Sequence, residues 1–349
     1  MEISENALVT LLLCSDLAVN GTNPLSDAAY SALAGALFKE DLQPQDLLTM
    51  SQADISQLYN KYRNTLFSRI RTGDFNIRIP GLIARRDDLL RELSELEKQG
   101  IQVLTRADKD LYPGKVRRKF LNGGIAYPAV IFYCGDLSLL NNSRTIAVVG
   151  SRNYEQDISA GDFTRQLIKK SVQEGWITAS GGARGIDQLA FDATVQDQGK
   201  SIIAVADSLC KKIADPAVKK EIVKGNALFM SLANPYAGFS VYNAMARNKM
   251  IYAVSDYALV VTCECYFTKN KKGEEVVSMT KGGTWAGALE CAAKNLSQLV
   301  VRKSDHAFRG NSELINKLKC LYIDEKRIFS RDRLEDIFNY SADYQQSLF

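Results

Sequence analysis

Between residues 144 and 302, continuous apolar runs alternate with segments of helical periodicity, and no other feature constrains the fold as strongly. Apolar runs without an alternating polar face are typical of strands buried on both faces of a parallel sheet. Strands are expected at 144–152, 176–182, 201–207, 227–232, 258–265 and 298–302. Helices are expected to end near 174 and 198 and to span 217–224, 242–255 and 284–294. The pattern predicts an α/β fold, an extended Rossmann-like, doubly wound and mostly parallel sheet.

The first hundred residues follow a helical pattern instead. Apolar residues three and four apart predict helices over 26–41, 44–70 and 83–100, with Ser26 before the first, Pro44 in the first turn of the second and Gly100 ending the third. We therefore expect a small all-α domain over 1–100. A Rossmann-like domain over 101–325, with a β-hairpin insertion over 266–278, and a tail over 326–349 complete the expected organisation.

Composition excludes several classes of protein. With 46% hydrophobic and 24% charged residues the chain is of ordinary globular type, and no apolar run approaches the roughly 20 residues of a membrane span. Glu2 and Glu5 stand where a signal peptide carries basic residues, so a cytoplasmic location is expected. Seven scattered cysteines are typical of reduced, buried thiols. His306 is the single histidine, which argues against a His-centred triad or a HExxH zinc site. We expect no metal, no cofactor and no catalytic residue.

Charge is distributed unevenly along the chain, although the net charge is only +4. Residues 1–59 hold one basic residue, Lys39, and eight acidic ones, whereas residues 60–120 hold fifteen basic and eight acidic ones. Such an asymmetry polarises the surface field and is consistent with an anionic partner, but surface solvation explains most such patterns.

Four donor-rich loops follow the expected strands, and ligands of doubly wound sheets bind at the carboxyl ends of strands. Glycines free backbone N–H groups at helix starts, where the dipole also favours an anion, and arginine is a bidentate phosphate donor. The expected phosphate-binding residues are Gly150, Ser151 and Arg152; Ser180, Gly181, Gly182 and Arg184; Arg247, Asn248 and Lys249; and Lys281, Gly282, Gly283 and Thr284. Together they predict a site for an anionic ligand.

Several of these segments also resemble a known family. The combination of VVGSR at 148–152 with SGGARGIDQLAFDAT at 180–194, RNKMI at 247–251, GGTWAGA at 282–288 and RGNSELINKL at 309–318 resembles the DNA-processing protein A (DprA, or Smf) family. The resemblance runs from about Ile101 to Ile323. The expected helical domain over 1–100 resembles, much less specifically, the small SAM-like or helix-hairpin-helix domain of that family. The chain departs from the family pattern at Phe191, where the family usually has His, at Lys249 in place of Arg, and in the Lys281–Gly283 loop, so it resembles a divergent member.

The resemblance implies binding of single-stranded DNA without sequence preference, no catalysis, dimerisation, and loading of a RecA-like recombinase. A role in transformation, repair or phage defence is compatible with it. Single strands are held by basic grooves and aromatic platforms. Phe239, Tyr242 and Trp285 are the candidate base-stacking residues, although each is also compatible with a place in the core.

A nucleotide sensor or hydrolase is the alternative. The GGTWAGALE loop resembles the GG-x-GT-x-x-E loop of LOG-type nucleotide phosphoribohydrolases, but Glu290 lies seven residues after Gly283 rather than six. The carboxylates available for such chemistry are Asp187, Asp207, Glu264 and Glu290. An NAD-dependent oxidoreductase is discounted, because the chain has neither a GxGxxG fingerprint nor a suitable proton donor.

The last five residues, Gln345–Gln–Ser–Leu–Phe349, resemble the pentapeptide with which bacterial proteins dock into the sliding clamp of DNA polymerase. Gln345, Leu348 and Phe349 would be its anchors. The other interpretation is that Leu348 and Phe349 fold back on the domain.

Overall fold

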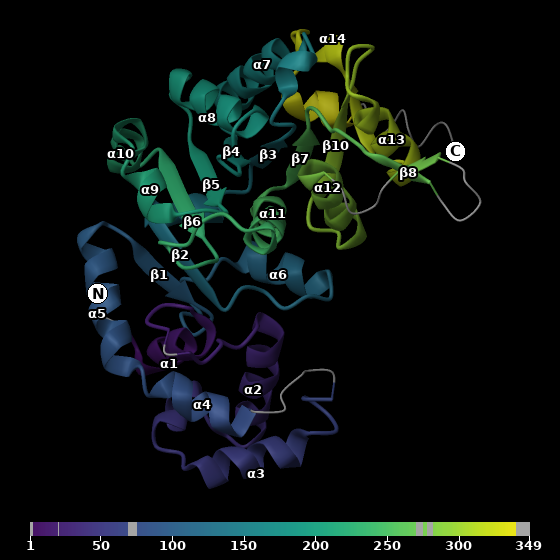
Figure 1. Ribbon diagram of the computed structural model, residues 1–349. Coiled ribbons are helices and arrows are strands. Elements are labelled where there is room, and N and C mark those ends of the chain that lie inside the picture. The colour runs from purple at the N-terminus through teal and green to yellow at the C-terminus, as the bar shows by residue number, and fades with distance from the viewer. Residues whose placement is uncertain (1–2, 20, 69–74, 270–274, 278–281, 340–349) are drawn as a thin grey trace.

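The computed structural model describes residues 3–19, 21–68, 75–269, 275–277 and 282–339. Its centre is a nine-stranded sheet with helices on both faces (Figure 1). The strands are β1 (Gln102–Thr105), β2 (Val130–Gly135), β3 (Thr145–Val149), β4 (Ile177–Ser180), β5 (Ser201–Val205), β6 (Ala227–Ser231), β7 (Tyr257–Val260), β10 (Gln298–Lys303) and β11 (Leu321–Asp324). Within the described residues, no helix has the length and apolar character needed to cross a membrane.

The strand order is β1-β2-β6-β5-β4-β3-β7-β10-β11. The β1–β2 and β2–β6 pairs are antiparallel and the other pairs are parallel, so the predicted doubly wound, mostly parallel sheet is confirmed. From β3 the chain adds β4, β5 and β6 on one side and then returns to place β7 on the other side of β3. The order therefore reverses between β3 and β7, which is where doubly wound sheets bind ligands.

Successive residues of the strands point to opposite faces and build two cores. In β3, Ala147 and Val149 join one core while Ile146 and Val148 join the other. The first face is covered by α6 (Gly114–Asn122), α11 (Val241–Val254), α12 (Gly283–Ala293) and α13 (Arg309–Leu318). The second is covered by α7 (Ala160–Gln173), α8 (Ile186–Gln196), α9 (Leu209–Ile213) and α10 (Pro216–Val223).

The first hundred residues are helical, as predicted, and lie beside the β1 edge of the sheet (Figure 1). They form α1 (Glu5–Cys14), α2 (Asp27–Lys39), the 3-10 helix η1 (Pro44–Leu48), α3 (Gln52–Tyr62), α4 (Phe75–Ile83) and α5 (Arg86–Lys98). Ser26 caps α2 by accepting a hydrogen bond from the Ala29 N–H. The single helix expected from residue 44 is wrong, because Ser51 and Asp54 form a capping box that starts a new helix.

The helical layer is not a separate globule. Its apolar residues share one core with β1, β2 and β6 and with Phe191 of α8. Phe191, where the family usually has His, stacks edge-on against Phe229 of β6 with ring centroids 5.6 Å apart. The departure from the family pattern is therefore a packing residue at the contact between the layers.

The C-terminal region adds β11 and α14 (Glu325–Ile328), with short 3-10 helices η2 (Leu137–Asn141) and η3 (Tyr154–Gln156) elsewhere. Residues 326–339, expected as part of a tail, pack on the sheet domain: Leu334, Ile337 and Phe338 are buried, and Phe338 stacks on Tyr257 with centroids 4.3 Å apart. The predicted hairpin insertion is present as the antiparallel pair β8 (Phe267–Lys269) and β9 (Glu275–Val277).

Candidate functional site

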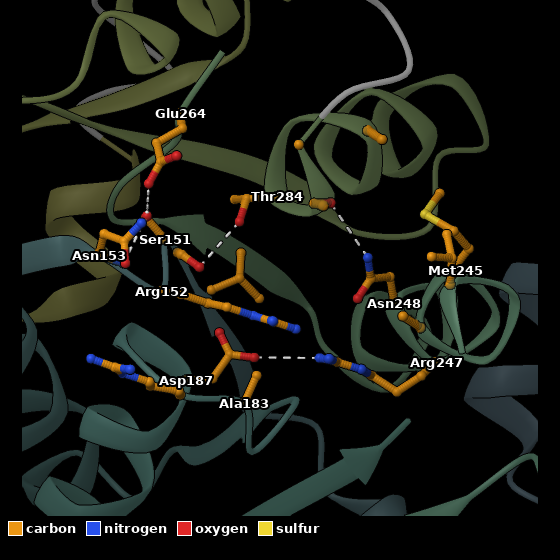
Figure 2. Close-up of a pocket in the computed structure, with 18 of the residues that line it drawn as sticks. Ser151, Arg152, Asn153, Ala183, Asp187, Met245, Arg247, Asn248, Glu264 and Thr284 are labelled. Carbon is orange, nitrogen blue, oxygen red and sulfur yellow. Dashed lines mark hydrogen bonds and ion pairs between the residues drawn. The ribbon is translucent and has the colours of Figure 1, made fainter. Parts of the chain in front are cut away.

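A cavity of about 410 Å³ opens at the β3/β7 switch point, between the ends of these strands, the first turns of α8 and α12, and one side of α11 (Figure 2). Residues of all four predicted loops reach it from different parts of the chain. Its lining includes Gly150, Ser151, Arg152, Asn153, Ala183, Arg184, Asp187, Phe239, Met245, Arg247, Asn248, Tyr252, Glu264, Tyr266, Gly282, Gly283 and Thr284.

The loop after β3 is held tightly in place. The Ser151 N–H donates to Thr262 Oγ1 at 2.8 Å, and the Ser151 hydroxyl donates to Glu264 Oε1 (Figure 2). Gly150 is required by space, because a Cβ there would lie 2.6 Å from Ile186 Cγ1 and 2.7 Å from Thr262 Oγ1. Ser151 is buried and its hydroxyl is engaged, so it orients Glu264 and leaves the exposed Arg152 as the cation of this loop.

The predicted anion cradle at Ser180–Gly182 is wrong. The Gly181 N–H donates to Asp187 Oδ2 at 3.0 Å, and the Gly182 N–H donates to Ser180 Oγ at 3.4 Å. The Ser180 hydroxyl donates to the Asp187 carbonyl at 3.1 Å. These residues are buried and lie outside the cavity lining, so the donors serve the turn itself. Arg184 of the same loop is exposed and does line the cavity.

A buried ion pair forms part of the cavity wall. Arg247 Nη1 lies 3.3 Å from Asp187 Oδ2, and the two residues are 8% and 6% exposed (Figure 2). Burial raises the pKa of the Asp187 carboxyl, against the lowering effects of the Arg247 charge and the Gly181 N–H. Arg247 therefore faces the cavity already paired with a carboxylate, unlike the exposed Arg152 and Arg184.

Of the two exposed aromatic candidates, Phe239 lines this cationic side of the cavity, and Tyr242 lies outside the cavity lining. Phe239 is 56% exposed, and its ring centroid lies 5.5 Å from Cζ of Arg152. Tyr242, on the first turn of α11, is 79% exposed. Trp285, the third candidate for base stacking, is fully buried in the core against the sheet, so that expectation is wrong.

The start of α12 forms the far wall. Gly283 is exposed, with open space around a Cβ built on it, and the Thr284 hydroxyl donates to the Gly150 carbonyl at 3.1 Å (Figure 2). The first helical N–H bond runs from Ala286 to Gly282 at 3.0 Å, which leaves the N–H groups of the preceding turn directed at the cavity end of the helix. Asn248 donates to the Gly283 carbonyl at 3.5 Å. Lys281 lies outside the described residues, as do Gln345, Leu348 and Phe349.

The remaining candidates separate into two groups. Glu264 and Asp187 line the cavity, whereas Asp207 and Glu290 do not. Glu290 forms an ion pair with Lys249 at 3.2 Å, so these two residues neutralise each other away from the lining. Among the residues with described positions, no cluster of three His, Cys, Asp or Glu side chains is arranged to hold a metal ion.

Sequence reasoning missed several lining residues: Asn153, Ala183, Met245, Tyr252 and Tyr266. Tyr266 could have been found from the sequence, because it directly follows the strand expected over 258–265, which carries Glu264. In the structure its hydroxyl donates to Glu264 Oε2 at 3.1 Å. Met245 and Tyr252 had none, since helical apolar residues are ordinarily core residues.

Residues 102–266 match the family model described as DNA recombination-mediator protein A. The DNA processing protein DprA of Bacillus subtilis is 28% identical over 183 residues, which cover 50% of this chain and 56% of that protein. DprA of Streptococcus pneumoniae is 28% identical over 127 residues, covering 36% and 43%. The chain thus spans about half the length of the curated relatives it matches.

The fold likeness extends further than the sequence likeness. The X-ray structure of DprA from Streptococcus pneumoniae aligns with a TM-score of 0.61 at 19% identity, covering 94% of this chain and 97% of that one. At this identity the likeness establishes a shared fold that includes the helical layer.

Proposed function

The chain belongs to the DNA-processing protein A family, and from this premise we propose that it binds single-stranded DNA without sequence preference at the switch-point cavity, as a recombination mediator rather than an enzyme. The observation that supports the site is the grouping of exposed cations and exposed aromatic rings. Arg152 and Arg184 supply guanidinium groups at the cavity, Phe239 offers a ring face beside Arg152, and the exposed Tyr242 follows the lining residue Val241 in the chain. A single strand needs this combination of phosphate donors and stacking platforms.

The start of α12 adds neutral donors to this arrangement. N–H groups at the first turn of a helix favour an anion through both hydrogen bonding and the helix dipole. Gly283 has no side chain to shield them, so a phosphate can approach the helix closely. Arg247 has a different role in the proposal: paired with Asp187, it fixes the wall against which the ligand lies.

Fluorescence anisotropy with a labelled oligo-dT of about 35 nucleotides tests the proposal. Wild type is expected to bind in a salt-sensitive manner and to prefer the single strand over a duplex. Arg152→Ala and Arg184→Ala are each expected to weaken binding and to reduce the salt slope by about 0.7 for each phosphate that is no longer neutralised. Arg165→Ala is the matched control, because Arg165 is an exposed arginine on α7 that pairs with Asp162 and lies outside the cavity. Absence of binding at low salt would refute the proposal.

The proposed role in binding single-stranded DNA also implies protein partners. We infer that the chain acts in the cytoplasm, forms a homodimer and delivers single strands to a RecA-like recombinase in transformation, repair or phage defence. The terminal Gln345–Phe349 segment is proposed to dock on the sliding clamp. A chain lacking residues 345–349 is expected to lose clamp binding in a pull-down while keeping oligo-dT binding, and unchanged clamp binding would exclude this role.

The nucleotide hydrolase remains as the second candidate because two carboxylates, Asp187 and Glu264, line a cavity of nucleotide size. Glu290, the carboxylate that the loop resemblance implies, instead pairs with Lys249 outside the lining. Release of free base from a panel of nucleoside monophosphates would support the hydrolase, and no product in that assay would exclude it.

A further inference from the structure

Glu264 is an unexpected group in a cavity proposed to bind a polyanion. Its carboxylate accepts hydrogen bonds from the Ser151 hydroxyl on Oε1 and from the Tyr266 hydroxyl on Oε2, the latter at 3.1 Å. Both donors are neutral hydroxyl groups, so neither of them compensates the charge of a carboxylate. Asp187, the other carboxylate of the lining, is instead paired with Arg247. For Glu264, no ion pair occurs among the residues whose positions are described. A phosphate is therefore repelled at Glu264, whereas an N–H or O–H donor is attracted.

The cavity lining therefore carries two kinds of binding group. The exposed guanidinium groups of Arg152 and Arg184 attract a phosphate, and Glu264 attracts a hydrogen-bond donor. A nucleotide carries both groups at its two ends. A volume of about 410 Å³ lies in the lower part of the range of small-ligand pockets, about 300–1,000 Å³, which suits one nucleotide rather than several.

The acceptor positions that remain on the Glu264 carboxylate distinguish among the bases. Each carboxylate oxygen accepts two hydrogen bonds, and the structure describes one on each oxygen of Glu264. One further acceptor position on each oxygen remains, and the two oxygens together match a pair of adjacent N–H donors. Guanine presents such a pair in its N1–H and its 2-amino group. Adenine and cytosine each present an amino group without an adjacent ring N–H, and thymine presents a ring N–H without an amino group.

Resting on the proposed function, we propose that the cavity binds one guanine nucleotide, with the N1–H and 2-amino edge on Glu264 and the phosphate at Arg152 and Arg184. The remainder of a DNA strand is then held by the exposed surface without regard to sequence. The same chemistry is offered by a free guanine nucleotide and by a guanine within a strand, so the experiment includes both.

The first arm is calorimetric titration of the full chain with dGMP, dIMP and dAMP. The dGMP is expected to bind about 5- to 150-fold more tightly than dAMP, the range of a bidentate base contact, with dIMP between them because it lacks the 2-amino group. Glu264→Gln is expected to remove this difference. Glu335→Gln is the matched control, because Glu335 pairs with Arg144 at the surface and lies outside the cavity.

If Glu264→Gln does not fold, Glu264→Asp withdraws the carboxylate by one methylene and is expected to lose the same preference. Equal affinity of wild type for the three nucleotides, or a preference that survives both substitutions, would overturn the inference.

The second arm compares a 35-nucleotide oligo-dT with the same oligonucleotide carrying one central dG. Tighter binding of the dG-containing strand places the guanine of a strand in the cavity, and a preference confined to dGMP identifies a free nucleotide as the ligand. The two proposals fail separately in this design. Oligo-dT binding without discrimination among nucleotides refutes only the guanine inference, and dGMP selectivity without oligo-dT binding refutes only the DNA proposal.

Discussion

Replacing Arg247 by methionine tests the assignment of this residue to the cavity wall. Arg247 and Asp187 are 8% and 6% exposed and lie 3.3 Å apart. The substitution keeps most of the side-chain volume and removes the charge, so it leaves Asp187 as a buried carboxylate whose described donors are backbone N–H groups such as that of Gly181.

The magnitude follows from the burial of the pair. Removing one partner of a buried ion pair costs about 3–5 kcal/mol, because the remaining charge keeps its desolvation penalty. At about 2 °C per kcal/mol for a chain of this size, the melting temperature is expected to fall by about 6–10 °C at neutral pH. Asp187→Asn combined with Arg247→Met removes the orphaned charge, so the double variant is expected to be more stable than Arg247→Met alone.

The same pair predicts a pH dependence. Burial raises the pKa of Asp187 above its ordinary value, so the folded state holds the proton more tightly than the unfolded state. The stability that this group contributes is full below the unfolded pKa and is lost as the pH rises through the folded pKa. Without Arg247 the folded pKa rises further. The stability of Arg247→Met is therefore expected to fall more steeply with rising pH than that of wild type, with the largest deficit at neutral pH.

Thermal melting followed by circular dichroism at acidic and neutral pH measures both effects. Arg91→Met is the control, since Arg91 is an exposed arginine on α5 that pairs with Asp88 at the surface, and its removal is expected to shift the melting temperature by less than about 2 °C. A deficit of Arg247→Met that is equally small, or that does not shrink at acidic pH, would refute the assignment of Arg247 to a buried structural pair.

Two further substitutions test the loop geometry and the stacking surface. Gly185→Ala is expected to lower both the melting temperature and the oligo-dT affinity. The φ angle of Gly185 is +96°, and a Cβ there would lie 2.3 Å from the Ser151 carbonyl oxygen. Gly238→Ala is the control, because a Cβ on Gly238 would meet open space. Phe239→Ala is expected to weaken oligo-dT binding about tenfold at unchanged melting temperature, as removal of one stacking platform does, whereas Phe38→Ala, at an exposed position on α2 outside the cavity, is expected to leave it unchanged. Equal effects of target and control would contradict either prediction.

The sheet can be predicted from sequence because its strands are apolar throughout and its helices have a clear period. Each of the six strands expected between 144 and 302 is present. A strand that is buried on both faces has apolar residues at nearly every position, and this run is easily recognised in the sequence. The helical layer is harder to predict. The segment from Pro44 onward has the apolar spacing of one helix, but Ser51 accepts from the Asp54 N–H and Asp54 accepts from the Ser51 N–H, and this local capping box outweighs the longer period.

The site is predictable at the level of loops and not at the level of roles, because the role of an arginine or a glycine here depends on what is buried beside it. Arg152, Arg184 and Arg247 are equivalent in the sequence, yet only Arg247 of the three faces a buried carboxylate among the described residues. The same Asp187 takes the Gly181 N–H that a glycine-rich loop ordinarily offers to a phosphate. Asp187 thus pairs with one expected cation and occupies one expected N–H donor, so we propose that a phosphate binds at the exposed arginines and at the first turn of α12. The opposite holds for Glu264: no cation pairs with it in the part of the chain that the structure describes, so its charge remains available to a ligand. Of the two carboxylates at this sheet edge, Asp187 is part of the cavity wall, and Glu264 is the one that we propose selects the ligand.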